Sequence, residues 1–220
     1  MKPYIVFDLD GTLVDSLPGI AEGVDRALAA MQRPVLGAQR VRGMIGQGAR
    51  NLCAQALGYA EPELAPPEEL EEMYRGFCRE YPLCWQGEGT APYAGIPELL
   101  TRLAGEGARL AVLSNKPHEV TLPMVQHLFP SIPFEPILGY TGRFPRKPAP
   151  DALLSIAQQW GVSPAELTLV GDSPYDARTA TAAESGLVLV SWGYACVEDL
   201  RAYPAPLAHS IARLESLLLG

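Results

Sequence analysis

Short runs of apolar residues, rich in Val, Ile and Leu, recur along the chain, and each is followed by a turn and a stretch with helical spacing. The runs cover residues 4–9, 108–113, 134–138, 167–170 and 187–190. Runs this short that are apolar throughout are typical of strands buried on both faces. Their alternation with helical segments predicts an α/β fold, in which a parallel sheet carries helices on both sides.

A different pattern separates the first apolar run from the second. Between about residues 16 and 86 the strand signals stop, and helical spacing appears over residues 20–31, 41–57 and 68–81. We therefore predict a small all-helical domain over residues 16–92, inserted into a core domain made of residues 1–15 and 93–220. The Gly- and Pro-rich segment 87–95 is an expected hinge, the alternative being a helical arm packed rigidly on the core.

Composition and charge narrow the class of protein. With 220 residues, 48% of them hydrophobic, the chain can bury a sizeable core. No apolar run approaches the roughly 18 residues of a membrane helix, and the N-terminus does not resemble a signal peptide, so we expect a cytoplasmic protein without a membrane partner. A formal charge of −8 argues against a general affinity for nucleic acid. The four cysteines show no zinc-site spacing and are expected to be free thiols.

Acidic residues follow two of the predicted strands. The first ends in Asp8 and Asp10, with Gly11 permitting a sharp turn, and the fourth is followed by Asp172. If these strands are neighbours, the three side chains meet at one edge of the sheet, where parallel sheets bind ligands. Two carboxylates about 4 Å apart repel by roughly 4 kcal/mol at an effective dielectric constant near 20. A cation is therefore required, and a cluster of oxygen ligands favours Mg²⁺. The alternative is that Asp8 and Asp10 are simple turn residues.

Asp176 has two interpretations that the sequence leaves open. With Ser173 three residues earlier and Pro174 at the first helical position, it fits a capping box at the start of a helix. It is also near enough to Asp172 in sequence to support a magnesium ion. The two roles are compatible.

Two further groups suit an anionic ligand. Ser114 ends the second predicted strand ahead of a helix, where a hydroxyl and backbone N–H groups form an anion cradle, although Ser114 could equally be an N-cap. Lys147 is followed by Pro148 and Pro150, which stiffen the chain around one ammonium group. Rigid presentation toward an acidic site favours a role in neutralising phosphate over that of a solvated loop lysine.

Four segments of the chain resemble, in order, the motifs of the haloacid dehalogenase-like hydrolase superfamily. They are FDLDGTLVDS at 7–16, SNKP at 114–117, KPAP at 147–150 and GDSPYD at 171–176. Within that superfamily the chain is most similar to the phosphoglycolate phosphatase group, because of SNKP and of IGQGA at 45–49. The resemblance implies a Rossmann-like core with a small helical cap.

The resemblance also implies a mechanism and a set of site residues. Asp8 would attack phosphorus to form an aspartyl-phosphate, and Asp10 would protonate the leaving alkoxide and then activate water. Ser114 and Lys147 would hold the phosphoryl oxygens. Thr12 and Asn115 lie in the same motifs and are expected to bind substrate.

Mg²⁺ is the implied cofactor, and part of the substrate site is expected in the cap. Asp8, the backbone carbonyl of Asp10, and Asp172 would bind the metal, with Asp176 supporting it directly or through water. Gln47 and Arg50 begin a predicted cap helix and are candidate substrate contacts, although surface polar residues are an equally good interpretation.

These features predict a phosphatase for a small phosphorylated metabolite, with 2-phosphoglycolate as the leading candidate. A phosphosugar mutase similar to β-phosphoglucomutase, an inorganic pyrophosphatase and a nucleotidase are the alternatives within the same fold. A non-catalytic phosphate-binding module is disfavoured because both acids of the first motif survive. Two departures bear on the substrate: residues 139–144 lack the acids often seen there, and Glu184 stands where glycine is common.

Overall fold

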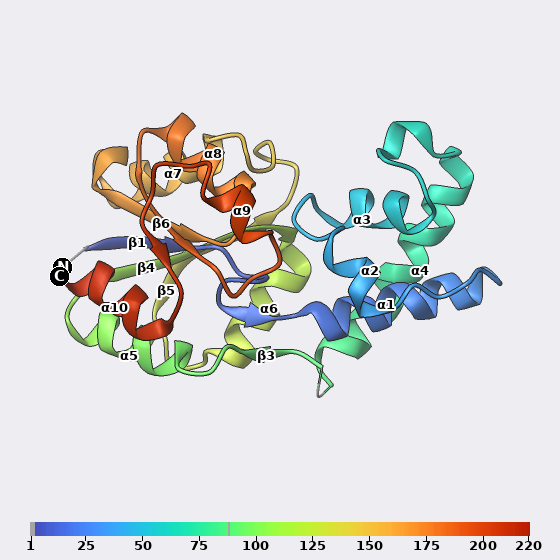
Figure 1. Ribbon diagram of the computed structural model, residues 1–220, viewed down its shortest axis with the longest axis horizontal. Coiled ribbons are helices and arrows are strands. Elements are labelled where there is room, and N and C mark those ends of the chain that lie inside the picture. Colours follow the sequence, from blue (N-terminus) through green and yellow to red (C-terminus); the bar gives the residue numbers. More distant parts are fainter. Residues whose placement is uncertain (1–2, 88) are drawn as a thin grey trace. The chain divides into compact units, whose positions relative to one another are not determined.

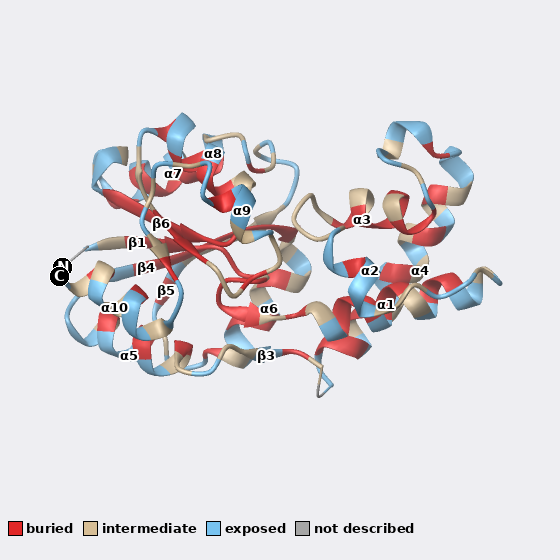
Figure 2. Ribbon diagram, in the orientation of Figure 1, coloured by how far each residue is buried: buried red, intermediate tan, exposed pale blue. Residues whose placement is uncertain are grey.

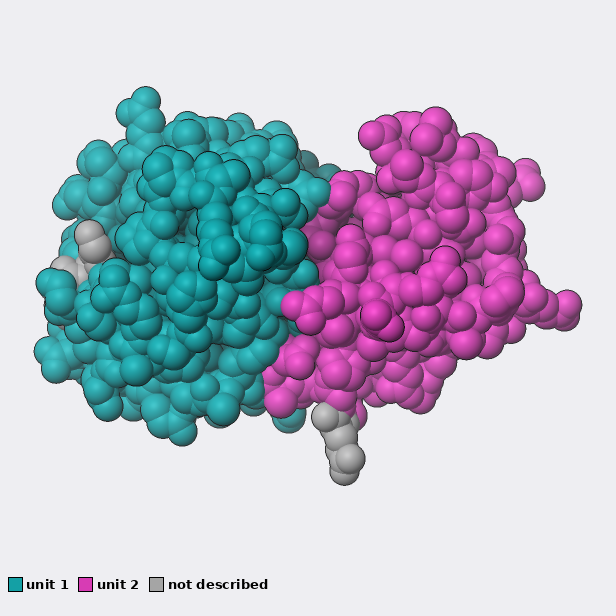
Figure 3. All heavy atoms as spheres, viewed as in Figure 1, with its two compact units in different colours: residues 1–14, 92–220 teal, residues 15–91 magenta. Residues whose placement is uncertain are grey.

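The computed structural model describes residues 3–87 and 89–220. The chain divides into two compact units, which Figure 3 distinguishes by colour. Unit 1 comprises Met1–Val14 and Pro92–Gly220, and unit 2 comprises Asp15–Ala91. At the two crossings between units, β2 (Val14–Asp15) and β3 (Ala91–Pro92) pair as a two-stranded sheet.

Unit 1 is built on a six-stranded sheet in the order β5-β4-β1-β6-β7-β8, with every neighbouring pair parallel. The α/β class with a parallel sheet is thereby confirmed. The strands are β1 (Tyr4–Phe7), β4 (Arg109–Pro117), β5 (Phe134–Tyr140), β6 (Leu167–Gly171), β7 (Gly186–Val190) and β8 (Leu207–Ala208).

Helices cover both faces of this sheet. In Figure 1, α7 and α8 lie on one face and α5 and α10 on the other. The core on the first side packs Val6 and Leu169 of the sheet against Leu153 and Ile156 of α7. Figure 2 shows the strands largely buried and the helices buried on one side only. This burial is expected for a parallel sheet that is covered by amphipathic helices on both faces. The helices are α5 (Ile96–Gly105), α6 (His118–Leu128), α7 (Asp151–Trp160), α8 (Pro174–Ala183), α9 (Val197–Leu200) and α10 (Ile211–Leu219), with a 3-10 turn at Pro164–Glu166.

The order of the strands creates a switch point at β1. After β1 the sheet grows through β4 and β5 on one side, and the chain then returns to add β6, β7 and β8 on the other. Phe7, the last residue of β1, pairs with Val112 of β4 and with Val170 of β6. The predicted proximity of the first and fourth strands is confirmed. Ligands of open parallel sheets bind beyond the strand ends at such a point.

The described residues of unit 2 form four α-helices and one 3-10 turn. The helices are α1 (Leu17–Ala30), α2 (Gly37–Arg42), α3 (Ala49–Ala56) and α4 (Pro67–Trp85), with the 3-10 turn at Pro62–Leu64. Small residues let α1 and α4 approach closely. A Cβ added at Gly23 would lie 3.2 Å from the Tyr81 Cα, and one at Gly76 would lie 3.3 Å from the Cβ of Ala27.

The structure corrects two predictions about elements. The prediction of a single helix over 41–57 is wrong, because α2 ends at Arg42 and α3 begins only at Ala49. Between them Gly46 and Gly48 have φ of 117° and 90°, which no helix accommodates. The short strand β8 was not predicted at all. The expected hinge segment 87–95 includes Glu88, which lies outside the described residues.

Two simpler expectations concern the cysteines and membrane helices. All four cysteines are free thiols, as predicted, with Cys53 and Cys84 buried and Cys78 and Cys196 exposed. Among residues 3–87 and 89–220, no helix has the length and apolar character needed to cross a bilayer.

Candidate active site

The end of β1 turns sharply and leaves two acids at the edge of the sheet. The amide of Asp8 still donates to the carbonyl of Val170 at 2.9 Å, so Asp8 continues the pairing with β6. Beyond it, the amides of Thr12, Leu13 and Val14 all donate to the Leu9 carbonyl, at 3.2, 3.0 and 3.0 Å. Gly11 has φ of 85° in this turn, a conformation that glycine adopts without strain.

Three carboxylates meet beyond the strand ends. Asp8, Asp172 and Asp176 each offer an oxygen within 4.8 Å of the others. Their residues are 8%, 3% and 0% exposed, so solvent screens them little. The side chain of Asp10 pairs elsewhere, as described below. We refer to Asp8, Asp172 and Asp176 as the acid cluster.

Three glycines surround the acid cluster so tightly that no side chain would fit. A Cβ at Gly11 or Gly193 would lie 2.4 or 2.1 Å from Asp172 Oδ2. A Cβ at Gly171 would lie 2.2 Å from the Cγ of Asp176. These glycines therefore set the space that the two carboxylates occupy.

Asp172 is held by one partner on each oxygen. Thr12 Oγ1 donates to Oδ1 at 3.0 Å, and the amide of Tyr194 donates to Oδ2 at 2.8 Å. Burial, together with the charges of Asp8 and Asp176, raises the pKa of Asp172 to about 8 despite these two hydrogen bonds. In this structure Thr12, which was expected to bind substrate, is buried and orients Asp172.

Lys147 is the cation inside the acid cluster. Its Nζ lies 2.8 Å from Asp8 Oδ1 and 2.6 Å from Asp176 Oδ1, and its side chain is 4% exposed. Burial lowers the pKa of Lys147, but Asp176 and Asp8 more than offset this effect and raise it overall. For Asp8 burial dominates over the attraction of Lys147, and its pKa rises to about 7.

Asn115 fixes the backbone of Lys147. Its Oδ1 accepts from the Lys147 amide at 2.8 Å, and its Nδ2 donates to the Lys147 carbonyl at 3.0 Å. This amide was expected to contact substrate, and the structure shows it joining β4 to the loop before α7. Ser114 beside it is buried, and its Oγ accepts from the Lys116 amide at 3.3 Å.

Lys116 is a site residue that the sequence analysis missed. Its Nζ donates to both carboxylate oxygens of Asp10, each at 2.8 Å, and the two side chains are 5% and 12% exposed. The sequence feature that could have indicated it is a lysine at the end of an apolar strand. A lysine buried at such a position needs a carboxylate partner.

The carboxylate of Asp176 makes the contacts of the capping interpretation, while its support of a metal ion stays a prediction. Its Oδ2 accepts from the amide and the hydroxyl of Ser173 at 3.1 and 2.6 Å, and its own amide donates back to Ser173 Oγ at 3.3 Å. This is a capping box, with Pro174 in the first turn of α8. The other oxygen, Oδ1, faces Lys147.

The two predicted substrate contacts of the cap lie in unit 2 and have partners there. Gln47 Oε1 accepts from Asn51 Nδ2 at 2.8 Å. Arg50 binds Glu71, with 2.6 Å between Nη2 and Oε2, and its guanidinium lies 4.7 Å from the centre of the Tyr74 ring. Their role toward substrate remains a prediction.

The donors of the acid cluster fit a divalent cation. All three are carboxylates, and one ammonium group leaves two negative charges in excess when all three are ionised. Buried acids with raised pKa values are groups that a cation would convert to their charged form. An all-oxygen set without His or thiol is the kind that Mg²⁺ prefers.

Comparison with known proteins shows the family of this chain. The model of the haloacid dehalogenase-like hydrolases matches residues 5–190. The chain belongs to the haloacid dehalogenase-like hydrolase family. Among these hydrolases it is similar to the phosphoglycolate phosphatases of Shigella boydii and Escherichia coli K12. Each is 35% identical to it over 205 residues, covering 86% of this chain and 81% of the relative.

Solved structures of hydrolases agree over the whole chain. A crystal structure from Lactobacillus delbrueckii subsp. bulgaricus is 27% identical, with a TM-score of 0.90, and covers 100% of this chain and 99% of its own. A predicted phosphoglycolate phosphatase from Haemophilus somnus is also 27% identical, with a TM-score of 0.86 and coverage of 98% and 97%. The protein is thus an enzyme of the phosphoglycolate phosphatase-like group of this family.

Proposed function

We propose that this hydrolase is a cytoplasmic, Mg²⁺-dependent phosphatase that cleaves a small phosphomonoester through an aspartyl-phosphate, with 2-phosphoglycolate as the leading substrate. The observation that carries the proposal is the acid cluster at the switch point of the sheet, in which Asp8 lies 2.8 Å from the buried Nζ of Lys147. The names of its relatives, phosphoglycolate phosphatases 35% identical to it, support the substrate.

Asp8 is the nucleophile in this proposal. One of its carboxylate oxygens attacks phosphorus, the ester bond to the substrate oxygen breaks, and the leaving alkoxide takes a proton from Asp10. Water then attacks the phosphorus of the aspartyl-phosphate and gives a proton to Asp10, which releases phosphate and restores Asp8. The covalent intermediate divides one difficult displacement into two easier ones. Asp10 serves as general acid and then as general base.

The remaining residues hold charge in place. In this proposal Lys147, whose ammonium contacts Asp8, neutralises the transferring phosphoryl oxygens, and the buried hydroxyl of Ser114 in β4 binds them. The carboxylates of the acid cluster and the backbone carbonyl of Asp10 would hold Mg²⁺. When bound, that ion supplies positive charge to the phosphoryl group and lets three acids stay ionised together.

A substrate panel with a matched pair of variants tests the proposal. Wild-type protein with Mg²⁺ is expected to release phosphate from 2-phosphoglycolate faster than from glucose 1-phosphate, pyrophosphate or nucleotides. Asp8→Asn is expected to lower kcat about 10³-fold or more, because an amide is not a nucleophile. Asp199→Asn, an exposed acid of α9 in the same unit, is the control and should keep full activity. Wild-type protein that hydrolysed none of these compounds would refute the proposed function.

A further inference from the structure

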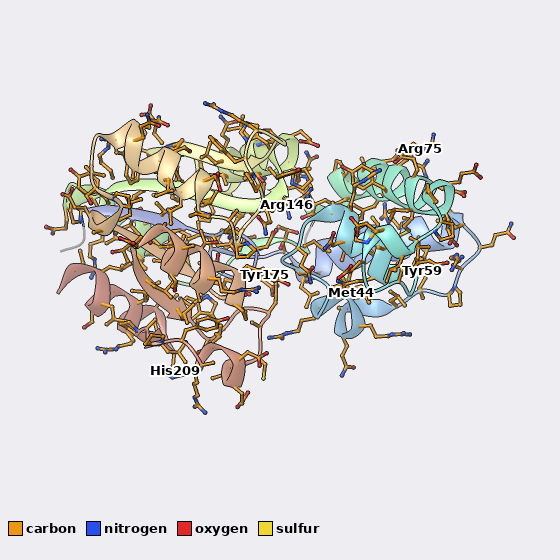
Figure 4. The ribbon with its side chains drawn as sticks, turned by 90° about the horizontal axis from the view of Figure 1, so that it is seen from above. Met44, Tyr59, Arg75, Arg146, Tyr175 and His209 are labelled. Carbon is orange, nitrogen blue, oxygen red and sulfur yellow. The ribbon has the colours of Figure 1, made fainter. Side chains whose placement is uncertain are left out.

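Arg146 lies at the same edge of the sheet as the acid cluster. It immediately precedes Lys147, and its guanidinium stacks 3.4 Å from the centre of the Tyr140 ring. Tyr140 is the last residue of β5 and pairs in register with Pro117 at the end of β4. Figure 4 shows Arg146 and Tyr175, from the first turn of α8, at this end of the sheet. Arg146 is therefore a second cation at this edge, next to Lys147 in the sequence.

The charge of Arg146 has no acidic partner among residues 3–87 and 89–220. Its Nε is buried, and no described group accepts a hydrogen bond from it. No ion pair among residues 3–87 and 89–220 includes its guanidinium. A buried N–H group without an acceptor is costly, so each one in a native structure calls for an explanation, of which a functional role is one. Stacking on Tyr140 fixes the plane of the guanidinium without using its donors.

The other cations of the site are already bound to acids. Lys147 bridges Asp8 and Asp176, and Lys116 holds both oxygens of Asp10. Arg146 is thus a cation at this edge, next to Lys147 in the sequence, whose charge is not paired with an acid among residues 3–87 and 89–220. A planar guanidinium with free donors suits a carboxylate, which it can bind through two parallel hydrogen bonds.

We propose that Arg146 binds the carboxylate of the substrate and so gives the enzyme its preference for carboxylate-bearing phosphomonoesters. This inference rests on the proposed function, in which Lys147 and Ser114 take the phosphoryl group of the same molecule. In 2-phosphoglycolate one carbon atom separates the carboxylate from the ester oxygen, so both anionic groups fall within the reach of neighbouring cations. Adjacent residues 146 and 147 then bind the two anionic groups of one small substrate.

A pair of substrates that differ only at the carboxylate tests the proposal. Ethyl phosphate replaces the carboxylate of 2-phosphoglycolate by a methyl group and keeps the phosphoester. The ratio is the kcat/KM for 2-phosphoglycolate divided by that for ethyl phosphate. It is expected to fall at least about tenfold in Arg146→Met, because only 2-phosphoglycolate loses a charge-assisted contact. Arg146→Lys keeps the charge without the planar fork and should recover part of the ratio.

A neighbouring arginine provides the control. Arg143 lies three residues earlier, is exposed, and stacks in a similar way on Phe144, 5.0 Å from the ring centre. Arg143→Met should leave the ratio within about twofold of the wild type, because Arg143 has no role in the proposed contact. An equal fall of the ratio in both variants would show a general loss of charge and would overturn the proposal.

The outcome separates this inference from the proposed function. If wild type hydrolyses 2-phosphoglycolate but Arg146→Met keeps the wild-type ratio, the inference fails and the phosphatase stands. A ratio that falls in Lys116→Met and not in Arg146→Met would assign the carboxylate to Lys116 and refute the role of Arg146. Binding is also measured by calorimetry in the inactive Asp8→Asn background. There, Arg146→Met should weaken the binding of 2-phosphoglycolate at least about tenfold more than the binding of ethyl phosphate. An equal loss of affinity for both compounds would contradict the inference.

Discussion

The ion pair between Lys116 and Asp10 places a cation on the proposed general acid and base. Because the ammonium donates to both oxygens of Asp10 at 2.8 Å, it fixes the direction in which that carboxylate points. We expect Lys116→Met to lower kcat about 10- to 100-fold, since a misplaced acid and base loses most of its contribution. Steady-state kinetics with 2-phosphoglycolate measure the effect, and the pH profile of kcat should change shape.

The conservative variant separates a role in positioning from a role in folding. Lys116→Arg keeps the cation beside Asp10 and should retain more activity than Lys116→Met at similar thermal stability. A Lys116→Met enzyme with the wild-type kcat and pH profile would show that the ion pair has no part in the reaction.

At the level of single residues, sequence reasoning identified groups better than it identified their partners. Asp8, Asp172 and Lys147 were expected at one site, and the structure brings them together. Thr12 and Asn115 hold Asp172 and the backbone of Lys147, contacts that the sequence did not indicate, and their binding of substrate stays a prediction. Motif spacing fixes which residues approach the site, but which donor meets which acceptor depends on the register of strands far apart in the sequence.

Helix α8 ends on a residue with an unfavourable backbone conformation. Glu184 follows the helix with φ of 56°, the left-handed region that favours glycine at this position. We expect Glu184→Gly to raise the free energy of unfolding by about 1 kcal/mol through relief of the Cβ clash. Thermal or denaturant unfolding of the purified variant measures the change.

A second helix end supplies the comparison for Glu184. Glu106 caps α5 with φ of −82°, where glycine relieves no strain and adds flexibility to the unfolded chain. Glu106→Gly should therefore leave stability unchanged or lower it. If both substitutions had the same effect, the left-handed conformation of Glu184 would not be the cause.

At the level of elements, five of the six core strands and the α/β class followed from the apolar runs. The missed strand β8 has only two residues, Leu207 and Ala208, which is too short for any periodicity to register. Helical spacing over 41–57 concealed a break because apolar positions continued through it, while Gly46 and Gly48 imposed backbone angles outside a helix. The glycines carried the better signal there.

For the whole molecule, the acid cluster links metal binding to pH. Asp8 and Asp172 have pKa values of about 7 and about 8 in the folded protein without metal. Both must lose their protons to bind Mg²⁺, so the affinity for Mg²⁺ should be at least about tenfold weaker at pH 6 than at pH 8. The rise in Tm on adding Mg²⁺, measured at both pH values, should be larger at pH 8.

The metal-free protein should show the opposite trend. Because folding raises both pKa values above the ordinary 3.8, the folded state retains protons that the unfolded chain releases. This contribution to stability is complete below pH 3.8 and is lost as the pH rises through 7 and 8. Asp172→Asn should reduce both the pH dependence and the effect of Mg²⁺. An equal Mg²⁺ effect at pH 6 and pH 8 in wild type would contradict the assignment.

Gly11, Gly171 and Gly193 are positions at which we expect this enzyme to accept no other residue. Gly11 and Gly193 lie in loops and Gly171 ends β6, and at each a single methyl group would overlap a carboxylate of the acid cluster. Saturation mutagenesis scored by phosphatase activity would therefore reject replacements at three sites that have no side chain of their own. Intolerance there would record how closely the backbone surrounds the acids, and an engineer changing the substrate should begin elsewhere.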